Sequence, residues 1–352
     1  MQQPLADGHS LMPNGSVDPA ALAVLLRDLA RETGCDLPED FSVEGPLSIR
    51  PQSVVYRLKQ SGGARSLAVK QYVDSPLGGP DRDAAVRQFA DLSRCYAAMQ
   101  ENADFRVPEP VGDFSDAAII LMEWIDGPSF LDALCRRWSS ARSLTPLSRL
   151  AGAWLRAFHD AGSASMSVCC TADLDQEIER ARIAMEREKV ALALANHAFE
   201  ALVAYRSAVA ARPVLRTWLH GDFQPGNVIF GPKAVYGIDI AYSTRGVALA
   251  DVAHFLNHVR RMAYLPSGLH LVASYRRILD DFVLGYSGAQ DVIDPLVLCW
   301  YRLLDDLRFL TRYYPHIRTG MHRWYFLHLQ RVAIAQYVAM LRRLAPQTAP
   351  GE

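Results

Sequence analysis

The sequence of 352 residues lacks an excess of either charge, because 37 Lys and Arg residues nearly balance 38 Asp and Glu residues. No global field is therefore available to hold nucleic acid or an anionic membrane, and we expect neither as a partner. Long apolar runs are also missing, since none reaches the about 20 residues of a membrane-spanning helix. Residues 1–17 lack the basic and apolar regions of a secretion signal, which predicts a cytoplasmic protein.

Paired cysteine spacings are missing as well. The six cysteines are scattered through unrelated segments and show no pattern typical of a zinc site or a disulfide framework. This distribution favours reduced thiols. Half of the residues are hydrophobic, so the chain can bury cores of considerable size in two lobes.

The first third of the chain alternates between helical and strand patterns. Residues 19–33 repeat apolar side chains at helical spacing and are followed by Gly34, which predicts a first helix. Alternating runs at 53–59 and 67–72 predict a hairpin in an antiparallel sheet. Helical periodicity returns at 83–100, and the compact apolar run at 117–124 predicts a buried strand.

Helical patterns dominate after residue 129. We expect helices at about residues 130–138, 145–162, 172–210, 247–261, 267–286, 293–314 and 321–345. Brief apolar runs near 218–219, 227–230 and 234–240, interrupted by Gly and Pro, predict short strands that carry loop residues.

These patterns predict an α+β fold with two lobes. A small antiparallel β-rich lobe is expected at 17–124 and a larger, mostly helical lobe at 125–346. Residues 1–16 and 347–352 are expected to be a flexible leader and tail.

Three polar side chains lie in and after the loop between the short strands. Asp222 stands between Gly221 and the breaker pair Pro225 and Gly226. Asn227 offers an amide oxygen, and Asp239 offers a carboxylate at the end of an apolar run; such hard oxygen ligands suit Mg²⁺. Phosphoryl transfer needs this set, with Asp222 placed to orient the acceptor hydroxyl and accept its proton.

The ordered sequence His220-Gly221-Asp222-Phe223-Gln224-Pro225-Gly226-Asn227, followed by Gly237-Ile238-Asp239, resembles the catalytic and metal-binding loops of the aminoglycoside phosphotransferase and choline kinase family. The resemblance implies a protein-kinase-like bilobal fold and a small-molecule kinase. It implies transfer of the γ-phosphate of ATP or GTP, with Mg²⁺, to a hydroxyl of a sugar, an amino alcohol or an aminoglycoside-like acceptor. Asp222 is then the catalytic residue, and Asn227 and Asp239 are the metal ligands.

Further family positions occur in order along the chain. Lys70, on a predicted strand, stands where the family has a lysine that meets the nucleotide phosphates. Glu123 and Trp124 resemble the segment between the lobes whose backbone meets the nucleotide base. Asp251 resembles an aspartate that accepts hydrogen bonds from the catalytic loop, and His220 is expected to brace that loop.

Two departures from the family pattern concern the nucleotide. Residues 83–100 contain no glutamate to pair with Lys70: Gln88 falls at the expected place, and Asp91 one turn away is an acidic substitute, or the nucleotide alone holds the lysine. The phosphate-covering loop at 50–56 contains no glycine. Ser53 is its candidate phosphate donor, or else an ordinary turn serine.

The acceptor site is expected on the late helices. Asp305, Asp306 and Arg308 interrupt an otherwise apolar helix, and the resemblance implies that acidic residues there line the acceptor pocket. Salt bridges between helices are the alternative, because buried charge must be paired. The missing glutamate also leaves a nucleotide-binding pseudokinase open, and a protein kinase would use the same chemistry on a peptide hydroxyl. The acceptor's identity and the oligomeric state are left open.

Overall fold

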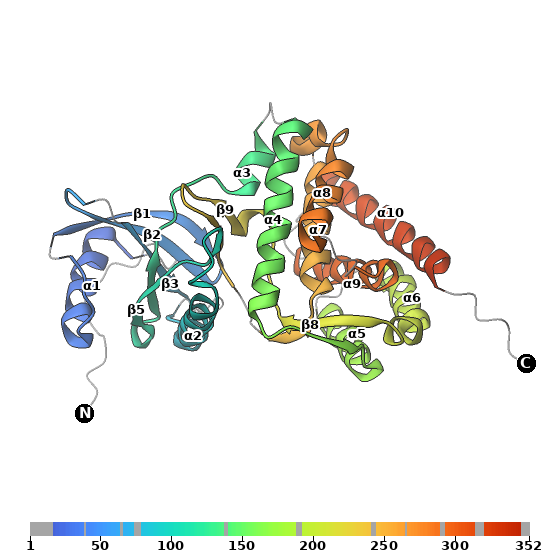
Figure 1. Ribbon diagram of the computed structural model, residues 1–352, viewed down its shortest axis with the longest axis horizontal. Helices are drawn as coiled ribbons and strands as arrows, with labels where there is room; N and C mark the ends of the chain where they lie inside the picture. Colours follow the sequence, from blue (N-terminus) through green and yellow to red (C-terminus); the bar gives the residue numbers. More distant parts are fainter. Residues whose placement is uncertain are drawn as a thin grey trace, which may run out of the picture. The chain divides into compact units, whose positions relative to one another are not determined.

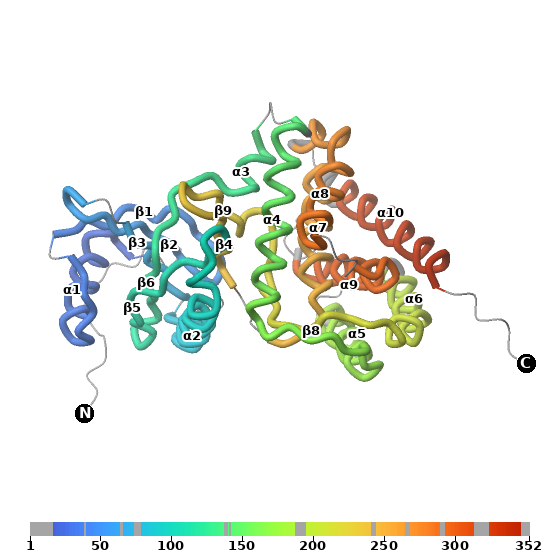
Figure 2. The backbone as a smooth tube through the Cα atoms, in the orientation of Figure 1, coloured from blue at the N-terminus to red at the C-terminus, as the bar shows by residue number. Residues whose placement is uncertain are grey.

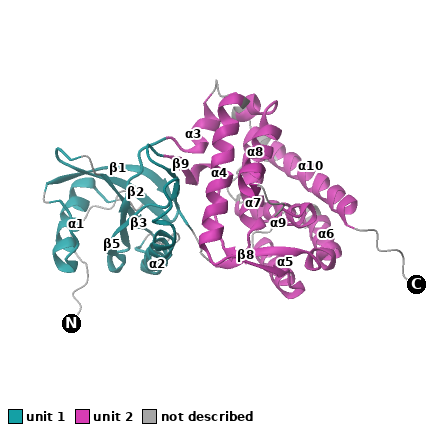
Figure 3. Ribbon diagram, in the orientation of Figure 1, with its two compact units in different colours: residues 1–127, 231–240 teal, residues 128–230, 241–352 magenta. Residues whose placement is uncertain are grey.

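The computed structural model (Figure 1) describes residues 17–38, 40–63, 66–73, 79–136, 140–187, 192–240, 244–264, 266–288, 293–313 and 320–345. Two compact units share these residues (Figure 3). One extends to Gly127 and includes Gly231–Ile240, and the other consists of Pro128–Phe230 and the chain from Ala241 onward. The short segment 231–240 therefore belongs to the first unit although it lies late in the sequence.

The first unit is built on an antiparallel sheet with the strand order β1-β2-β3-β6-β5. Its strands are β1 (Phe41–Arg50), β2 (Ser53–Gln60), β3 (Ser66–Tyr72), β5 (Pro110–Phe114) and β6 (Ile119–Glu123). The predicted hairpin is β2 and β3, which pair from Ser53↔Tyr72 to Lys59↔Ser66. Two short strands complete the unit, because β4 (Phe105–Arg106) pairs in parallel with β10 (Val235–Gly237).

Helices cover both faces of this sheet. The predicted first helix is α1 (Pro19–Thr33), capped by the Asp18 side chain and ended by Gly34 in a left-handed conformation. Its apolar stripe packs on the face that carries Val69 and Leu121. The opposite face, carrying Ile120, packs against α2 (Arg82–Met99), with η1 (Ser115–Ala117) beside it. Since side chains alternate along a strand, Lys70 lies on the α2 face.

The second unit is mostly helical. Its helices are α3 (Phe130–Cys135), α4 (Ala141–Ala161), α5 (Thr171–Arg187), α6 (Leu192–Ala210), α7 (Leu249–Ala263), α8 (Tyr275–Ser287), α9 (Pro295–Tyr313) and α10 (Gly320–Leu344), with the 3₁₀ turns η2 (Pro225–Asn227) and η3 (Pro266–Leu271). Its short strands are β7 (Ser165–Val168), β8 (Pro213–Trp218), β9 (Val228–Phe230) and β11 (Arg245–Val247). β8 pairs with both β7 and β11 in an antiparallel sheet.

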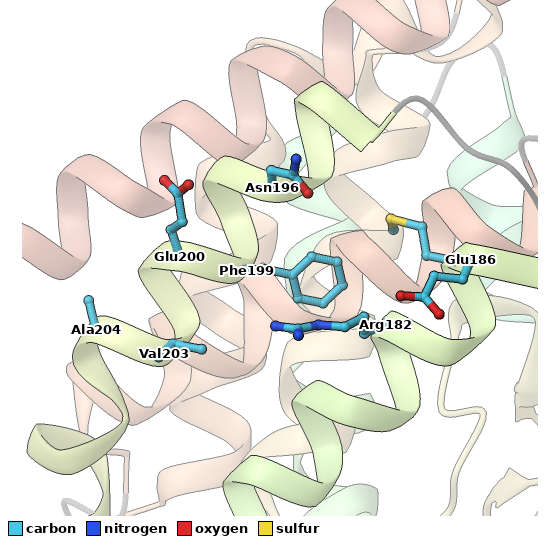
Figure 4. A pocket seen from close by; sticks show the side chains of 8 residues that line it. Arg182, Glu186, Asn196, Phe199, Glu200, Val203 and Ala204 are labelled. Carbon is cyan, nitrogen blue, oxygen red and sulfur yellow. The ribbon is translucent and has the colours of Figure 1, made fainter.

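The single helix predicted at 172–210 was wrong. The segment forms α5 and α6, which pack side by side (Figure 4). The guanidinium carbon of Arg182 of α5 lies 5.7 Å from the ring centroid of Phe199 of α6, within the about 6 Å of a cation–π contact. Apolar periodicity continues from the segment of α5 into that of α6, so the sequence pattern alone did not separate the two helices.

Two other expectations were tested over the described residues. None of the described helices is long and apolar enough to cross a membrane. All six cysteines are free thiols, as their spacing predicted.

Helices α4 and α8 pack against each other (Figure 2). Their close approach depends on two glycines. A Cβ atom added at Gly152 would lie 2.1 Å from the carbonyl oxygen of Phe282, and one added at Gly285 would lie 2.0 Å from that of Arg149. Backbone atoms cannot move aside without displacing a helix. The two glycines therefore set the separation of the helices that carry the site described below.

Gly152→Ala is predicted to destabilise the protein by about 2 kcal/mol or more, although alanine normally favours a helix, because the methyl group overpacks the α4–α8 contact. Thermal unfolding followed by circular dichroism measures the change. Gly226→Ala is the matched control, since its Cβ would meet Leu131 at an ordinary 3.5 Å. Equal melting temperatures for the two variants would contradict the role of Gly152.

Candidate active site

The loop of residues 220–227 follows β8 and is shaped by its own sequence. Gly221 has a φ of 80°, a conformation that glycine adopts without steric cost. Phe223 is fully buried and stacks on Trp154 and Phe255 at centroid distances of 5.4 and 5.3 Å. Pro225 then starts η2, which ends at Asn227. The loop is anchored in the helical unit through its one large apolar side chain.

Asp251, in the first turn of α7, holds the backbone of this loop. Its buried carboxylate accepts hydrogen bonds from the N–H groups of His220 at 2.7 Å and Gly221 at 3.0 Å. Nε2 of His159 lies 3.1 Å away, and Nδ1 of the same ring contacts the Tyr286 hydroxyl at 2.9 Å. Burial would raise the pKa of Asp251, but hydrogen bonds from His159 and His220 hold it below its ordinary value.

Asp222 lies at the exposed side of the loop, with 22% of its side chain accessible. Its Oδ2 accepts hydrogen bonds from Gln224 at 2.9 Å and Asn227 at 3.3 Å. Its Oδ1 lies 3.3 Å from Nε2 of His254 and 3.8 Å from Arg312. Burial would raise the pKa of Asp222, but His254 and Arg312 lower it below the ordinary value. The carboxylate is therefore ionised, as a group that takes the proton of a hydroxyl must be.

A pocket of about 190 Å³ opens beside Asp222 within the helical unit. Asp305 and Arg308 of α9 line it, as does His254 of α7. The carboxylate of Asp305 is nevertheless already bound by other side chains of the helical unit. Nδ1 of His254 lies 2.7 Å from its Oδ1, and Asn257 donates a hydrogen bond to its Oδ2 at 2.9 Å. Arg308 forms an ion pair with Glu177. The predicted recognition residues thus reach the pocket with charges that the protein already balances.

Asp306 has a different place from its neighbour. Its side chain is fully buried and forms two 2.8 Å contacts with Arg260 and one with Arg261. It is not among the residues that line the pocket. The salt-bridge alternative therefore describes Asp306, which joins α9 to α7.

Lys70 and Asp239 form an ion pair within the first unit, with Nζ 2.8 Å from Oδ1. Burial would lower the pKa of Lys70, but Asp239 and Tyr72 raise it above its ordinary value. The lysine is therefore charged. Asp239 has a φ of 56°, a strained conformation for most residues that aspartate tolerates better than others.

Polar residues of α2, the helix that follows Lys70 in the chain, pair with groups other than Lys70. Asp91 forms a 2.5 Å ion pair with Arg94 one turn along α2, so the structure gives Lys70 its carboxylate partner in Asp239 rather than in Asp91. Gln88 donates a 2.6 Å hydrogen bond to the carbonyl oxygen of Ile240. It thereby holds the backbone next to Asp239.

Ser53 is the first residue of β2, and only 8% of its surface is exposed. It pairs with Arg50 across the β1–β2 turn and with Tyr72 on β3. This puts it at the turn that the sequence assigned to phosphate covering. Its role as a phosphate donor stays a prediction.

The segment after β6 has its backbone N–H groups engaged. The N–H of Glu123 donates to Glu109 at 2.8 Å, and that of Trp124 donates to Ser66 at 3.1 Å. The indole of Trp124 packs under Arg57, whose guanidinium carbon lies 4.9 Å from the ring centroid. Contacts of Glu123 and Trp124 with a nucleotide base would therefore use their other atoms.

The oxygen atoms proposed for a metal fit its chemistry. Asn227 is nearly buried, and its Nδ2 donates to the backbone oxygen of Asp222 at 2.8 Å. Since the amide is planar, this turns Oδ1 away from Asp222, where it can act as a ligand. Among the described residues no group of three or more His, Cys, Asp and Glu side chains could hold a metal ion. A cation that takes few protein ligands and completes its shell with phosphate and water, as Mg²⁺ does, suits this set.

Another pocket, of about 610 Å³, lies between α5 and α6 (Figure 4). It is lined by Arg182, Met185, Glu186, Asn196, Phe199, Glu200, Val203 and Ala204. None of these is a predicted site residue.

The sequence model of the phosphotransferase enzyme family matches residues 52–281, which include Lys70, the 220–227 loop, Asp239 and Asp251. The chain belongs to this family. The predicted enzyme class, an ATP-dependent phosphotransferase acting on a hydroxyl acceptor, is thereby confirmed at the level of the family.

Solved structures confirm the predicted protein-kinase-like α+β fold. An ethanolamine kinase from Plasmodium vivax is 13% identical, with 93% of this chain and 91% of that chain covered and a TM-score of 0.58. An amicoumacin kinase in complex with AMP-PNP and Ca²⁺ is 12% identical, with 89% and 93% covered and a TM-score of 0.57. A choline/ethanolamine kinase family protein from Mesorhizobium loti is 15% identical, with 93% and 95% covered and a TM-score of 0.51. No curated protein matches the sequence.

Three contacts of Asp222 in this phosphotransferase were not predicted: Gln224, His254 and Arg312. His254 follows Asp251 by three residues, which puts both side chains on one face of α7, and this spacing was the available signal. Arg312 approaches Asp222 only through the packing of α9. No local sequence pattern predicts that contact.

Asp251→Asn is predicted to destabilise the protein by about 2–4 kcal/mol, because an amide cannot accept hydrogen bonds from three donors and would turn its own NH₂ toward one of them. Since folding lowers the pKa of Asp251, its contribution is present at neutral pH and is lost as the pH falls below about 4. Urea unfolding at pH 7 measures the difference. Asp280→Asn, at an exposed position of α8, is the control, and an Asp251 variant as stable as this control would refute the bracing role.

Proposed function

We propose that this phosphotransferase transfers the γ-phosphate of ATP or GTP, with Mg²⁺, to a hydroxyl of a small molecule such as a sugar, an amino alcohol or an aminoglycoside-like acceptor. The observation that carries the proposal is the ionised, oriented carboxylate of Asp222 at the edge of a pocket within the helical unit. With a volume of about 190 Å³, this pocket is smaller than the ~300–1,000 Å³ typical of drug-sized ligands. A small acceptor fits it better than a peptide segment does.

Asp222 is the proposed catalytic residue. Its carboxylate would accept a hydrogen bond from the acceptor hydroxyl, align the oxygen for in-line attack, and take the proton as the new P–O bond forms. Gln224 and Asn227 both donate to Oδ2, which limits rotation of the carboxylate. The lowered pKa of Asp222 favours this orienting role over strong basicity.

Lys70, Asn227 and Asp239 are the proposed nucleotide and metal residues. A bound Mg²⁺ would neutralise charge on the transferred phosphoryl group. Asn227 and Asp239 would each supply an oxygen ligand. Lys70, kept charged in its buried position, would bind phosphate oxygens, and Ser53 at the β1–β2 turn would donate a further hydrogen bond.

The acceptor class rests on family membership and on the size of the pocket. The similar structures include proteins named as an ethanolamine kinase and an amicoumacin kinase, and these names do not agree on one acceptor. Asp305 is the proposed recognition residue in the pocket, together with Arg308. Asp306 is excluded from that proposal because its carboxylate is enclosed by Arg260 and Arg261.

Asp222→Asn is predicted to lower turnover by about 10²-fold or more, because the amide cannot take the hydroxyl proton. Acceptor-dependent ADP release, with an acceptor identified by screening hydroxylated metabolites, measures it. Asp160→Asn is the matched control, since Asp160 pairs with Arg156 on the surface of α4 with 51% of its side chain exposed. Wild-type turnover in the Asp222 variant would defeat the proposal.

Lys70→Met is predicted to raise the nucleotide KM about tenfold or more, because one charge-assisted contact to phosphate is worth about 1.5–3 kcal/mol. Lys59→Met is the control: Lys59 lies on the neighbouring strand β2, pairs with Glu44 and has 41% of its side chain exposed. Steady-state kinetics at saturating acceptor give both values. An unchanged KM in the Lys70 variant would remove this lysine from the nucleotide site.

A further inference from the structure

His254 of α7 lies between two carboxylates. Its Nδ1 is 2.7 Å from Oδ1 of Asp305 on α9, and its Nε2 is 3.3 Å from Oδ1 of Asp222 in the loop. Nδ1 hydrogen-bonds to Asp305, whereas Nε2 lies within ion-pair distance of Asp222 without forming a hydrogen bond in this structure. A neutral imidazole has a proton on only one nitrogen and would turn a lone pair toward one of the two carboxylates. The doubly protonated imidazolium puts a positive charge within ion-pair distance of both carboxylates.

The Asp305 end of this bridge is fixed. Asn257 donates to Oδ2 of Asp305 at 2.9 Å, and Arg261 forms an ion pair with the same oxygen. Arg261 is itself held at 2.8 Å by buried Asp306. Asp305 cannot rotate without breaking these contacts, so it is an anchor for the histidine rather than a mobile partner.

The surroundings of His254 favour its charged form. Burial would lower the pKa of His254, but Asp305 and Asp222 raise it to about 9. The pKa of His258, one turn further along α7, is lowered instead: burial and the charge of His254 bring it to about 4. The charged and titratable side chains that line the pocket with His254 are Asp222, Asp251, His258, Arg261, Tyr301, Asp305, Arg308 and Arg312.

We propose that His254 is a positioning residue for phosphoryl transfer, which as an imidazolium ties Asp222 to the anchored carboxylate of Asp305 and so fixes the direction from which Asp222 meets the acceptor hydroxyl. The inference rests on the proposed function of Asp222. It adds a chain of alternating charges, Asp222–His254–Asp305–Arg261, that connects the reacting carboxylate with the packed interface of α7 and α9.

The bridge has a defined pH range. Folding raises the pKa of His254. Its contribution to stability is therefore fully present below about pH 6.5 and is lost as the pH rises through about 9. Turnover of the wild-type protein is therefore expected to fall on the alkaline side near pH 9. In His254→Gln the neutral amide can donate to only one carboxylate. We expect kcat to drop about tenfold or more at pH 7.5, with the nucleotide KM unchanged, and the alkaline decline near pH 9 to disappear.

The test combines kinetics with a measurement that needs no turnover. Long-range ¹H–¹⁵N NMR of the wild-type protein, with His254 assigned by its absence in His254→Gln, gives the pKa of His254 directly. A second variant, Asp305→Asn, removes one anion and should shift both this pKa and the alkaline limb of kcat to lower pH together. His197→Gln, an exposed residue of α6 beside Glu200, is the control and should leave both unchanged.

The outcomes separate this inference from the proposed function. Full turnover in Asp222→Asn would overturn the proposed function, whatever His254 does. If Asp222→Asn is inactive but His254→Gln keeps the wild-type kcat and pH profile, only the positioning role is overturned. A His254 pKa of about 6.5 in the wild-type protein would likewise overturn it, because the imidazole would then be neutral during catalysis at pH 7.5.

Discussion

The buried carboxylate of Asp251 joins segments that are far apart in the sequence. It accepts hydrogen bonds from two backbone N–H groups of the 220–227 loop and contacts His159 of α4, which in turn contacts Tyr286 of α8. A buried carboxylate is costly unless such partners surround it. The loop conformation, the α4–α8 packing and the ionised state of Asp251 therefore depend on one another.

Helix α7, which carries Asp251, also takes part in a second network formed by charged side chains. From Asp222 the charges alternate through His254, Asp305, Arg261 and Asp306 to Arg260, which also donates to the Tyr337 hydroxyl of α10 at 2.9 Å. Each buried charge has an opposite neighbour, as a low-dielectric interior requires. The pocket beside Asp222, the proposed acceptor site, is thus bounded by side chains whose charges are already balanced. Recognition of an acceptor there must rely on the remaining hydrogen-bonding capacity of these groups and on shape.

Much of the fold could be predicted from the sequence because local patterns determine it. Gly34 ends α1, and the alternating runs form β2 and β3. The loop motif was recognisable because its residue types and spacing are set by the chemistry of phosphoryl transfer. The failures have physical causes too. No interruption of apolar periodicity separates the segments that form α5 and α6. The sequence also does not show that consecutive Asp305 and Asp306 face different surroundings on α9.

Pairings between distant residues were the hardest to foresee. Lys70 pairs with Asp239, 169 positions later in the chain, and not with α2, where Asp91 already pairs with Arg94. Gln88, at the position where a glutamate was expected, holds the backbone of Ile240 instead. The missing glutamate therefore does not leave Lys70 without a carboxylate. The positively charged state of Lys70 is maintained by the residue that is also the proposed metal ligand.

The most direct test of this account is a calorimetric titration of the wild-type protein with a non-hydrolysable ATP analogue, in Mg²⁺ and again with the metal removed by chelation. If Asn227 and Asp239 hold the cation against the phosphates, binding must be tight with Mg²⁺ and at least about tenfold weaker without it. Equal binding under both conditions, or none under either, would contradict a metal-dependent phosphotransferase and favour a nucleotide-binding or scaffolding module.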